Sequence, residues 1–294
     1  MSHPASLRAV LALLGAAFLY GATFVVIKSA LDDIEPISLV AWRFAIGAVV
    51  LLAFAFPRGR AIWVDGTITG VALFAGYTLQ TSGLAATSAT NSALITGLYV
   101  VLTPVLAALF KRRSPRAWVL VAATAAFVGI FLLTYTEGVT LSRGDLLTVG
   151  CALAFALHII ALARYAGRHP VVPFSAVQLS VVALLAFPSA MLVDGAGIPQ
   201  PSVWGALLIT GLGVGIGAFL LQVWAQTILG PSTAAVILSA EPAFAVATAW
   251  VVLGERLDLL GWTGAALIVM AIFLVVSRQS DEASQLAEAV TPAH

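Results

Sequence analysis

The sequence predicts an all-α membrane protein in which ten transmembrane helices form two inverted five-helix repeats. Three observations support this fold class. Of the 294 residues, 61% are hydrophobic and 9% are charged, whereas soluble domains carry about 25% charged residues. Ten apolar stretches follow one another, each close to the roughly 20 residues that cross a hydrocarbon core of about 30 Å. The last five stretches repeat the first five at a nearly constant offset.

The predicted spans are separated by short polar loops. In the first repeat we expect helices near residues 7–30, 36–56, 63–86, 89–110 and 116–135. In the second repeat we expect them near 144–165, 172–193, 202–228, 231–252 and 257–277. The expected domains are therefore a repeat over 7–135, a repeat over 144–277 and a cytoplasmic tail over 278–294. The first span is too long for the apolar core of a signal peptide and has a counterpart in mid-chain, so we expect it to be retained.

The repeat is visible residue by residue. At an offset of 137, Ala17–Phe18 of the first span match Ala154–Phe155 of the sixth, and Ser38 and Val40 of the second match Ser175 and Val177 of the seventh. At an offset of 142, Tyr77 and Gln80 of the third span meet Phe219 and Gln222 of the eighth, and Ile130–Leu132 of the fifth meet Ile272–Leu274 of the tenth. Because five is odd, the two copies must enter the membrane with opposite orientation. Inverted repeats of this kind are typical of alternating-access transporters, whose substrate site lies where the halves face each other near the midplane.

Lysine and arginine in the short loops predict the orientation, because cytoplasmic loops carry an excess of both. Ten basic residues fall on one side: Arg8, Arg58, Arg60, Lys111, Arg112, Arg113, Arg116, Arg164, Arg168 and Arg278. Only Lys28, Arg143 and Arg256 fall on the other side. We therefore expect both termini in the cytoplasm and the chain in the inner (plasma) membrane. The net charge of +1 gives no reason to expect a nucleic-acid partner, so the expected partners are the lipid bilayer and a small-molecule substrate. We expect a monomer.

Polar side chains inside the spans are costly in lipid and so mark candidate functional residues. Tyr77 with Gln80, and Phe219 with Gln222, form stripes at matching depths on two symmetry-related helices, which favours a shared cavity over hydrogen bonds between neighbouring helices. Aromatic residues that could form an apolar wall are Tyr77, Tyr99, Phe155, Phe219 and Trp224. Residues that could offer hydrogen bonds are Gln80, Asn91, His158, Gln178 and Gln222.

Three residues with a charged or imidazole side chain lie more than one helical turn from the ends of their spans. Glu241 is deep in the ninth span directly before Pro242, and either a bond that braces the proline kink or a proton-coupling role would explain it; we expect the structural bond. His158 is either a structural histidine or a contact for substrate or protons. Arg43 is expected to extend toward the external end of its helix and join an ion-pair cluster. Pro104 and Pro242 should kink two equivalent helices, which suits gates.

The sequence contains no Walker phosphate loop, HExxH metal motif or GxSxG nucleophile elbow. We therefore expect neither a cofactor nor a bound metal, no catalytic residues and no enzymatic activity. Cys151 is the only cysteine and is expected to pack as a small buried hydrophobe.

Residues 7–277 resemble the EamA-type members of the drug/metabolite transporter superfamily. The resemblance rests on the motifs Ala41–Phe44, Ser239–Pro242 and Leu253–Arg256 together with the ten-helix repeat. It implies a single-chain carrier that exports amino acids or other small metabolites from a cavity between two helix bundles. The stretch Ala89–Pro104 is similar, more narrowly, to YddG-type exporters of aromatic and other amino acids.

The leading hypothesis is thus a facilitative or proton-linked exporter of amino acids, aromatic and other neutral ones, with broad specificity. An alternative is efflux of cationic drugs or dyes, for which Glu241 would be the counter-charge. A remote alternative is an intramembrane enzyme or a lipid scramblase, which the single deep carboxylate disfavours.

Overall fold

The computed structural model describes residues 3–87, 89–112, 114–134, 142–193, 195, 197–253 and 258–290. Helices and their connections make up this described part, which contains no strand. The helices of the first half are α1 (His3–Ala30), α2 (Pro36–Phe54), α3 (Arg60–Ala86), α4 (Ala89–Thr96), α5 (Tyr99–Phe110) and α6 (Ala117–Thr134). Those of the second half are α7 (Arg143–Tyr165), η1 (Ala166–Arg168), α8 (Val171–Val193), η2 (Pro201–Val203), α9 (Trp204–Leu208), η3 (Ile209–Ala218), α10 (Phe219–Gln226), α11 (Pro231–Leu238), α12 (Glu241–Leu253) and α13 (Leu259–Val290).

The ten predicted spans each correspond to helical structure. Within the described ranges, seven helical segments are long and apolar enough to cross a membrane, and they match the first three, the sixth to eighth and the tenth spans. The fifth span is α6, while the fourth and ninth are each divided into two shorter helices, α4 with α5 and α11 with α12. The predicted all-α membrane fold is therefore confirmed. The last helix, α13, extends to Val290, beyond the end expected at 277.

The two interrupted helices break at equivalent positions. A turn at Gly97–Leu98 separates α4 from α5, and a turn at Ser239–Ala240, 142 residues later, separates α11 from α12. The interruption before Pro104 thus lies about two helical turns upstream of the proline, which itself sits inside α5. Tyr99 and Glu241 are consequently the first residues of two equivalent half-helices.

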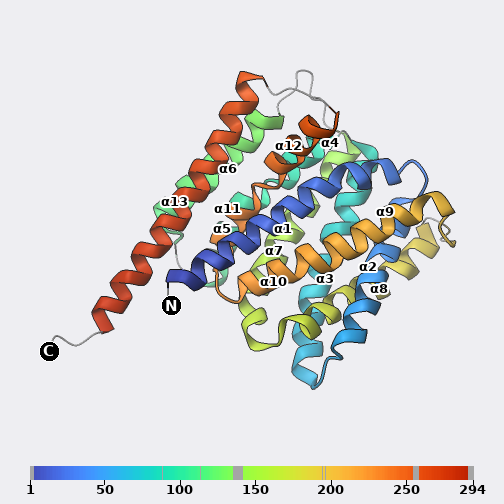
Figure 1. The fold of residues 1–294 in the computed structure, drawn as a ribbon, viewed down its shortest axis with the longest axis horizontal. Coiled ribbons are helices and arrows are strands. Elements are labelled where there is room, and N and C mark those ends of the chain that lie inside the picture. The colour runs from blue at the N-terminus through green and yellow to red at the C-terminus, as the bar shows by residue number, and fades with distance from the viewer. Residues whose placement is uncertain are drawn as a thin grey trace.

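Equivalent helices pair at opposite ends of the bundle, α6 with α13 and α2 with α8 (Figure 1). In the α2–α8 pair, Trp42 contacts Phe187 while Gly47 approaches Leu179. Because the residue numbers rise on one helix as they fall on the other, this pair is antiparallel. Two equivalent helices that run antiparallel belong to repeats of opposite orientation, as the odd helix number requires.

The remaining contacts also come in symmetric sets: α3 packs on α7 and α8, and α1 and α2 pack on η3. Glycines allow the closest approaches. A Cβ atom on Gly144 would lie 2.7 Å from backbone atoms of Gly83 and Ala86, and a Cβ on Gly76 would lie 2.5 Å from the Phe155 ring. Real Cβ contacts are not so short, so these positions let α3 and α7 lie against each other.

One helix departs from the symmetry. Residues Ile209–Ala218 form a π-helix between α9 and α10, whereas the equivalent part of α3 is a regular α-helix. The segment carries Gly211, Gly213, Gly215 and Gly217. A Cβ on Gly211 would lie 2.8 Å from the Arg43 carbonyl oxygen, so close packing on α2 depends on this glycine. π-Helices are rare, and π-helical turns are frequently found at functional sites.

Polar contacts also join the two repeats away from the bundle centre. The Asp65 carboxylate of α3 lies 2.8 Å from Nε2 of His169, just before α8, and 3.8 Å from Nη1 of Arg168. At the other end of α3, the Thr87 hydroxyl donates to the Asp145 carboxylate at 2.7 Å. Asp145 also completes a capping box with Ser142 at the start of α7, so one carboxylate holds both the cap and the inter-repeat contact.

Candidate functional site

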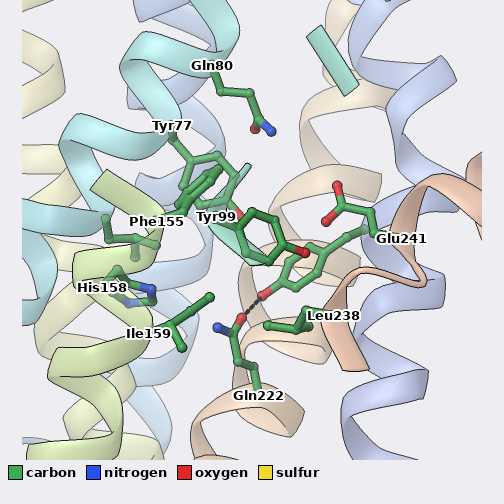
Figure 2. A pocket seen from close by; sticks show the side chains of 11 residues that line it. Tyr77, Gln80, Tyr99, Phe155, His158, Ile159, Gln222, Leu238 and Glu241 are labelled. Atoms are coloured by element: carbon green, nitrogen blue, oxygen red, sulfur yellow. Dashed lines mark hydrogen bonds between the residues drawn. The ribbon is translucent and has the colours of Figure 1, made fainter. Parts of the chain in front are cut away.

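A cavity lies between helices of both repeats near the two helix interruptions (Figure 2). Its empty volume, including space open to solvent, is about 440 Å³. The lining residues come from α1, α3, α5, α7, α10, α11 and α12; they are Tyr20, Leu73, Tyr77, Gln80, Tyr99, Phe155, His158, Ile159, Gln222, Leu238 and Glu241. A second hollow of about 390 Å³ shares Gln80, Tyr99 and Glu241 with the first, so the two adjoin.

Glu241 is the acidic residue of this cavity, and it lies where the two hollows meet. The turn at Ser239–Ala240 ends α11, so Glu241 starts the next half-helix with its side chain directed into the cavity rather than along a continuous span. Figure 2 shows its carboxylate turned toward Gln80 and Tyr99. None of the hydrogen bonds or ion pairs formed among the described residues involves this carboxylate. An unpaired carboxylate in a low-dielectric site attracts a cation or a hydrogen-bond donor.

The two equivalent glutamines have different surroundings. The Tyr20 hydroxyl donates to Gln222 Oε1 at 2.6 Å, and Gln222 Nε2 donates to Gln226 Oε1 at 3.2 Å. Gln226 Nε2 then donates to the Ile159 carbonyl at 2.9 Å, which extends the chain from α1 through α10 to α7. The Gln80 side chain makes no hydrogen bond within the described part of the protein. Gln80 is therefore free to bind a ligand, while Gln222 is held in place by its neighbours.

His158 lies in the cavity wall but faces a polar partner behind it. The side chain is 2% exposed, and its Nε2 donates to Gln178 Oε1 at 3.2 Å. The Phe219 ring stacks on the imidazole at 5.9 Å between ring centres. Gln178 and Phe219 thus orient His158 from outside the cavity.

Aromatic rings form much of the wall. The Tyr77 ring packs edge to face against Phe155 at 5.2 Å, and Phe44 lies 4.8 Å from Tyr77 on the other side. Gly76 makes the Phe155 contact possible, because any side chain there would meet the ring. Flat rings of this kind accommodate varied apolar groups and attract cations to their faces.

Seven predicted site residues do lie together in the cavity wall: Tyr77, Gln80, Tyr99, Phe155, His158, Gln222 and Glu241. Gln178 and Phe219 lie one layer behind, and Trp224 packs against the core formed by α1, α5, α7 and α11. Asn91 lies on α4, but its side chain is outside the described part of the structure. Pro242 borders the second hollow, whereas Pro104 lies in α5 away from both.

Four wall residues were not among the predicted site residues: Tyr20, Leu73, Ile159 and Leu238. The membrane cost of a tyrosine hydroxyl was the signal available for Tyr20. Leu73, Ile159 and Leu238 carry no signal, because leucine and isoleucine also face lipid.

The expectation for Arg43 was wrong. Its side chain is 2% exposed and turns into the bundle, where the guanidinium carbon lies 4.7 Å from the Tyr77 ring centre and 5.1 Å from that of Phe44. The ion pairs found among the described residues do not include it. Aromatic faces inside the bundle, rather than the acidic residues of the loop, attract the guanidinium.

Within the described residues, no three His, Cys, Asp or Glu side chains converge as metal ligands would. Cys151 is fully buried, with its sulfur 3.9 Å from the Thr96 hydroxyl.

Comparisons with known proteins agree with this architecture. A model of the EamA-like transporter family matches residues 7–135 and again residues 142–277. A protein of Archaeoglobus fulgidus described as an uncharacterized transporter is 35% identical over 267 residues, which cover 89% of this chain and 83% of that protein. The uncharacterized transporter YyaM of Bacillus subtilis is 27% identical over 284 residues, covering 88% of this chain and 90% of the relative. A protein of known crystal structure superimposes on this chain with a TM-score of 0.75 at 22% sequence identity. The superposition covers 97% of this chain and 99% of that protein's chain, which shows that the two share a fold.

Proposed function

Because this chain belongs to the EamA-like transporter family and resembles proteins described as transporters, we propose that it exports neutral amino acids, aromatic ones among them, from the cytoplasm by alternating access. Transport of small solutes across a membrane follows from the family. The choice of amino acids is the proposal, and it depends on the chemistry of the cavity.

The observation that carries the proposal is the Glu241 carboxylate, which no described residue pairs, in a wall that is otherwise aromatic, aliphatic or neutral and polar. A carboxylate without a protein partner suits the ammonium group of an amino acid, since a charge-assisted hydrogen bond compensates both groups. The rings of Tyr77, Tyr99 and Phe155 suit an apolar or aromatic side chain. Gln80 has free amide donors for a carboxylate, because no described residue uses them.

The location between the repeats supports alternating access. Both interrupted helices contribute wall residues, Tyr99 from α5 and Leu238 with Glu241 from α11 and α12. Interrupted helices at corresponding positions of two inverted repeats are the usual mark of a transporter binding site. Export across the inner membrane, by a facilitative or a proton-linked mechanism, completes the proposal.

Efflux of cationic drugs or dyes is a second candidate, and the same observation favours it. Glu241 together with three tyrosines and a phenylalanine would also attract a hydrophobic cation. The difference between the candidates is the carboxylate that an amino acid carries and a cationic dye lacks.

The test is transport by the purified protein in liposomes. Uptake of radiolabelled phenylalanine, leucine and alanine and of a cationic dye would be compared, each with and without a pH gradient. The proposal expects uptake of the neutral amino acids above that of empty liposomes, and competition among them. Uptake of the dye alone would instead support drug efflux. A rate that changes with the pH gradient would identify proton coupling.

A further inference from the structure

Arg43 is a buried cation next to the cavity that no acidic group of the described residues neutralises. The side chain is 2% exposed, and its Nε and Nη1 atoms have no hydrogen-bond partner among the described residues. Arginine keeps its charge in proteins, so it cannot reduce the cost of burial by releasing a proton. The cation–π contacts with Tyr77 and Phe44 offset only part of that cost, because a buried guanidinium is normally paired and hydrogen-bonded.

One aromatic ring separates this guanidinium from the cavity. Arg43 is not a wall residue, but its guanidinium carbon lies 4.7 Å from the centre of the Tyr77 ring, and Tyr77 is a wall residue. Packing fixes the arginine there: its carbonyl oxygen lies against Gly211 of the π-helix, so α2 cannot withdraw from the centre of the bundle without losing that contact. A turn of the Tyr77 side chain would expose the unpaired N–H groups to the cavity.

Arg43 and Glu241 are therefore opposite charges that flank the same cavity without pairing with each other. Arg43 belongs to α2 of the first repeat, and Glu241 begins α12 of the second. Two uncompensated charges of opposite sign, one from each repeat, are complementary to a molecule that carries both an ammonium and a carboxylate group.

We propose that Arg43 binds the carboxylate of a zwitterionic substrate once Tyr77 turns aside, while Glu241 binds its ammonium group. This inference rests on the proposed amino-acid transport and assigns the second half of the recognition to a residue outside the wall. A guanidinium offers two parallel N–H groups to one carboxylate, which a neutral amide does not. The bound substrate then contacts both repeats, so its binding depends on how the two repeats are placed relative to each other.

The experiment compares a zwitterion with the amine that lacks only the carboxylate. Phenylalanine and phenethylamine share the ring and the ammonium group, so the ratio of their transport rates measures the contribution of the carboxylate. Both rates are measured on the same liposomes, and the ratio is thus insensitive to the fraction of folded protein. The variants are Arg43→Gln, Arg43→Met and, as a matched control, Arg58→Gln at an exposed loop arginine. Arg43→Met is included because a long apolar side chain is tolerated in place of a buried charge.

We expect the phenylalanine to phenethylamine ratio to fall roughly 10- to 100-fold in Arg43→Gln and in Arg43→Met, as for loss of a hydrogen bond to a charged group. It should stay at the wild-type value in Arg58→Gln. An unchanged ratio in whichever Arg43 variant folds, including an equal fall of both rates, would overturn the proposal and leave amino-acid transport standing. A wild-type protein that moves phenethylamine but no amino acid would instead contradict the proposed function itself.

Discussion

Replacing each of the two equivalent glutamines by leucine should lower stability in the case of Gln222, but lower transport without lowering stability in the case of Gln80. Gln222 takes part in two side-chain hydrogen bonds, one with Tyr20 at 2.6 Å and one with Gln226 at 3.2 Å, whereas Gln80 makes none with any described residue. Hydrogen bonds between membrane helices contribute about 0.6 kcal/mol each on average. Gln222→Leu should therefore lower the free energy of unfolding by about 1 kcal/mol, and by up to about 3 kcal/mol if the Tyr20 hydroxyl is left without a partner.

Gln80→Leu should leave stability within about 0.5 kcal/mol of the wild type, because no hydrogen bond is lost. It should nevertheless reduce transport per folded molecule, because the free amide lines both hollows. The assay pairs thermal unfolding in detergent, where about 1 kcal/mol corresponds to a shift of about 2 °C for a chain of this size, with transport in liposomes normalised to folded protein.

The two variants serve as controls for each other, since they make the same change at positions related by the repeat. Equal destabilisation by both would show that Gln80 has a helix-bridging partner. Full transport activity in Gln80→Leu would refute the assignment of Gln80 to the substrate site.

Three further outcomes are expected. Glu241→Gln should reduce transport of ammonium-bearing substrates by about tenfold or more while leaving the melting temperature unchanged, as measured in the same two assays; a lower melting temperature with normal transport would support the brace at Pro242. Gly21→Ala should destabilise the protein by about 1 to 3 kcal/mol in thermal unfolding, because the new Cβ would lie 2.5 Å from the Glu241 carbonyl oxygen. Gly213→Ala is the control, since a Cβ at Gly213 has no neighbouring atom within 4 Å. A reporter enzyme active only in the periplasm should stay silent when fused after Arg278, and activity there would contradict cytoplasmic termini.

Much of the fold could be predicted because lipid imposes strict requirements on the chain. A segment in hydrocarbon must be helical and about 20 residues long, so composition alone locates most spans. The duplication predicted which helices are equivalent. The offset of 142 residues that aligns Gln80 with Gln222 also aligns the two helix interruptions, before Tyr99 and before Glu241. The positions of the interruptions could not be predicted from the sequence, because Gly97–Leu98 and Ser239–Ala240 have no helix-breaking residue in common. The prolines predicted kinks at Pro104 and Pro242, which lie C-terminal to the interruptions.

The site was predictable to the extent that polar residues pay a membrane penalty. That signal identified Gln80, Gln222, Tyr99 and Glu241. It could not distinguish residues that line the cavity from residues packed behind its wall, and so it also selected Gln178, which lies behind His158. Phe219 was misplaced for another reason. Its spacing of three residues from Gln222 within α10 put both side chains on one predicted stripe, but the Phe219 ring stacks on His158 behind the wall.

The error at Arg43 concerns electrostatics rather than geometry. An arginine near a helix end normally extends to the interface, and acidic residues were close in sequence. In the folded protein the guanidinium lies on aromatic faces inside the bundle instead, and Tyr77 is available only because α3 packs beside α2. Which side chain of another helix lies beside Arg43 depends on tertiary packing, and a local sequence pattern does not predict it.

The near-symmetry of the scaffold and the asymmetry of its site have separate consequences for the proposed mechanism. Two inverted repeats with matching interruptions can exchange conformations, and the states open to either side then differ little in free energy, so binding of a substrate can shift their populations. The cavity, by contrast, holds a tyrosine at the start of one half-helix and a glutamate at the equivalent position of the other. A symmetric cavity would bind a substrate equally well in two reversed orientations. With Glu241 in one repeat and Arg43 in the other, a zwitterion has one favoured orientation, and it keeps contact with both repeats as they move.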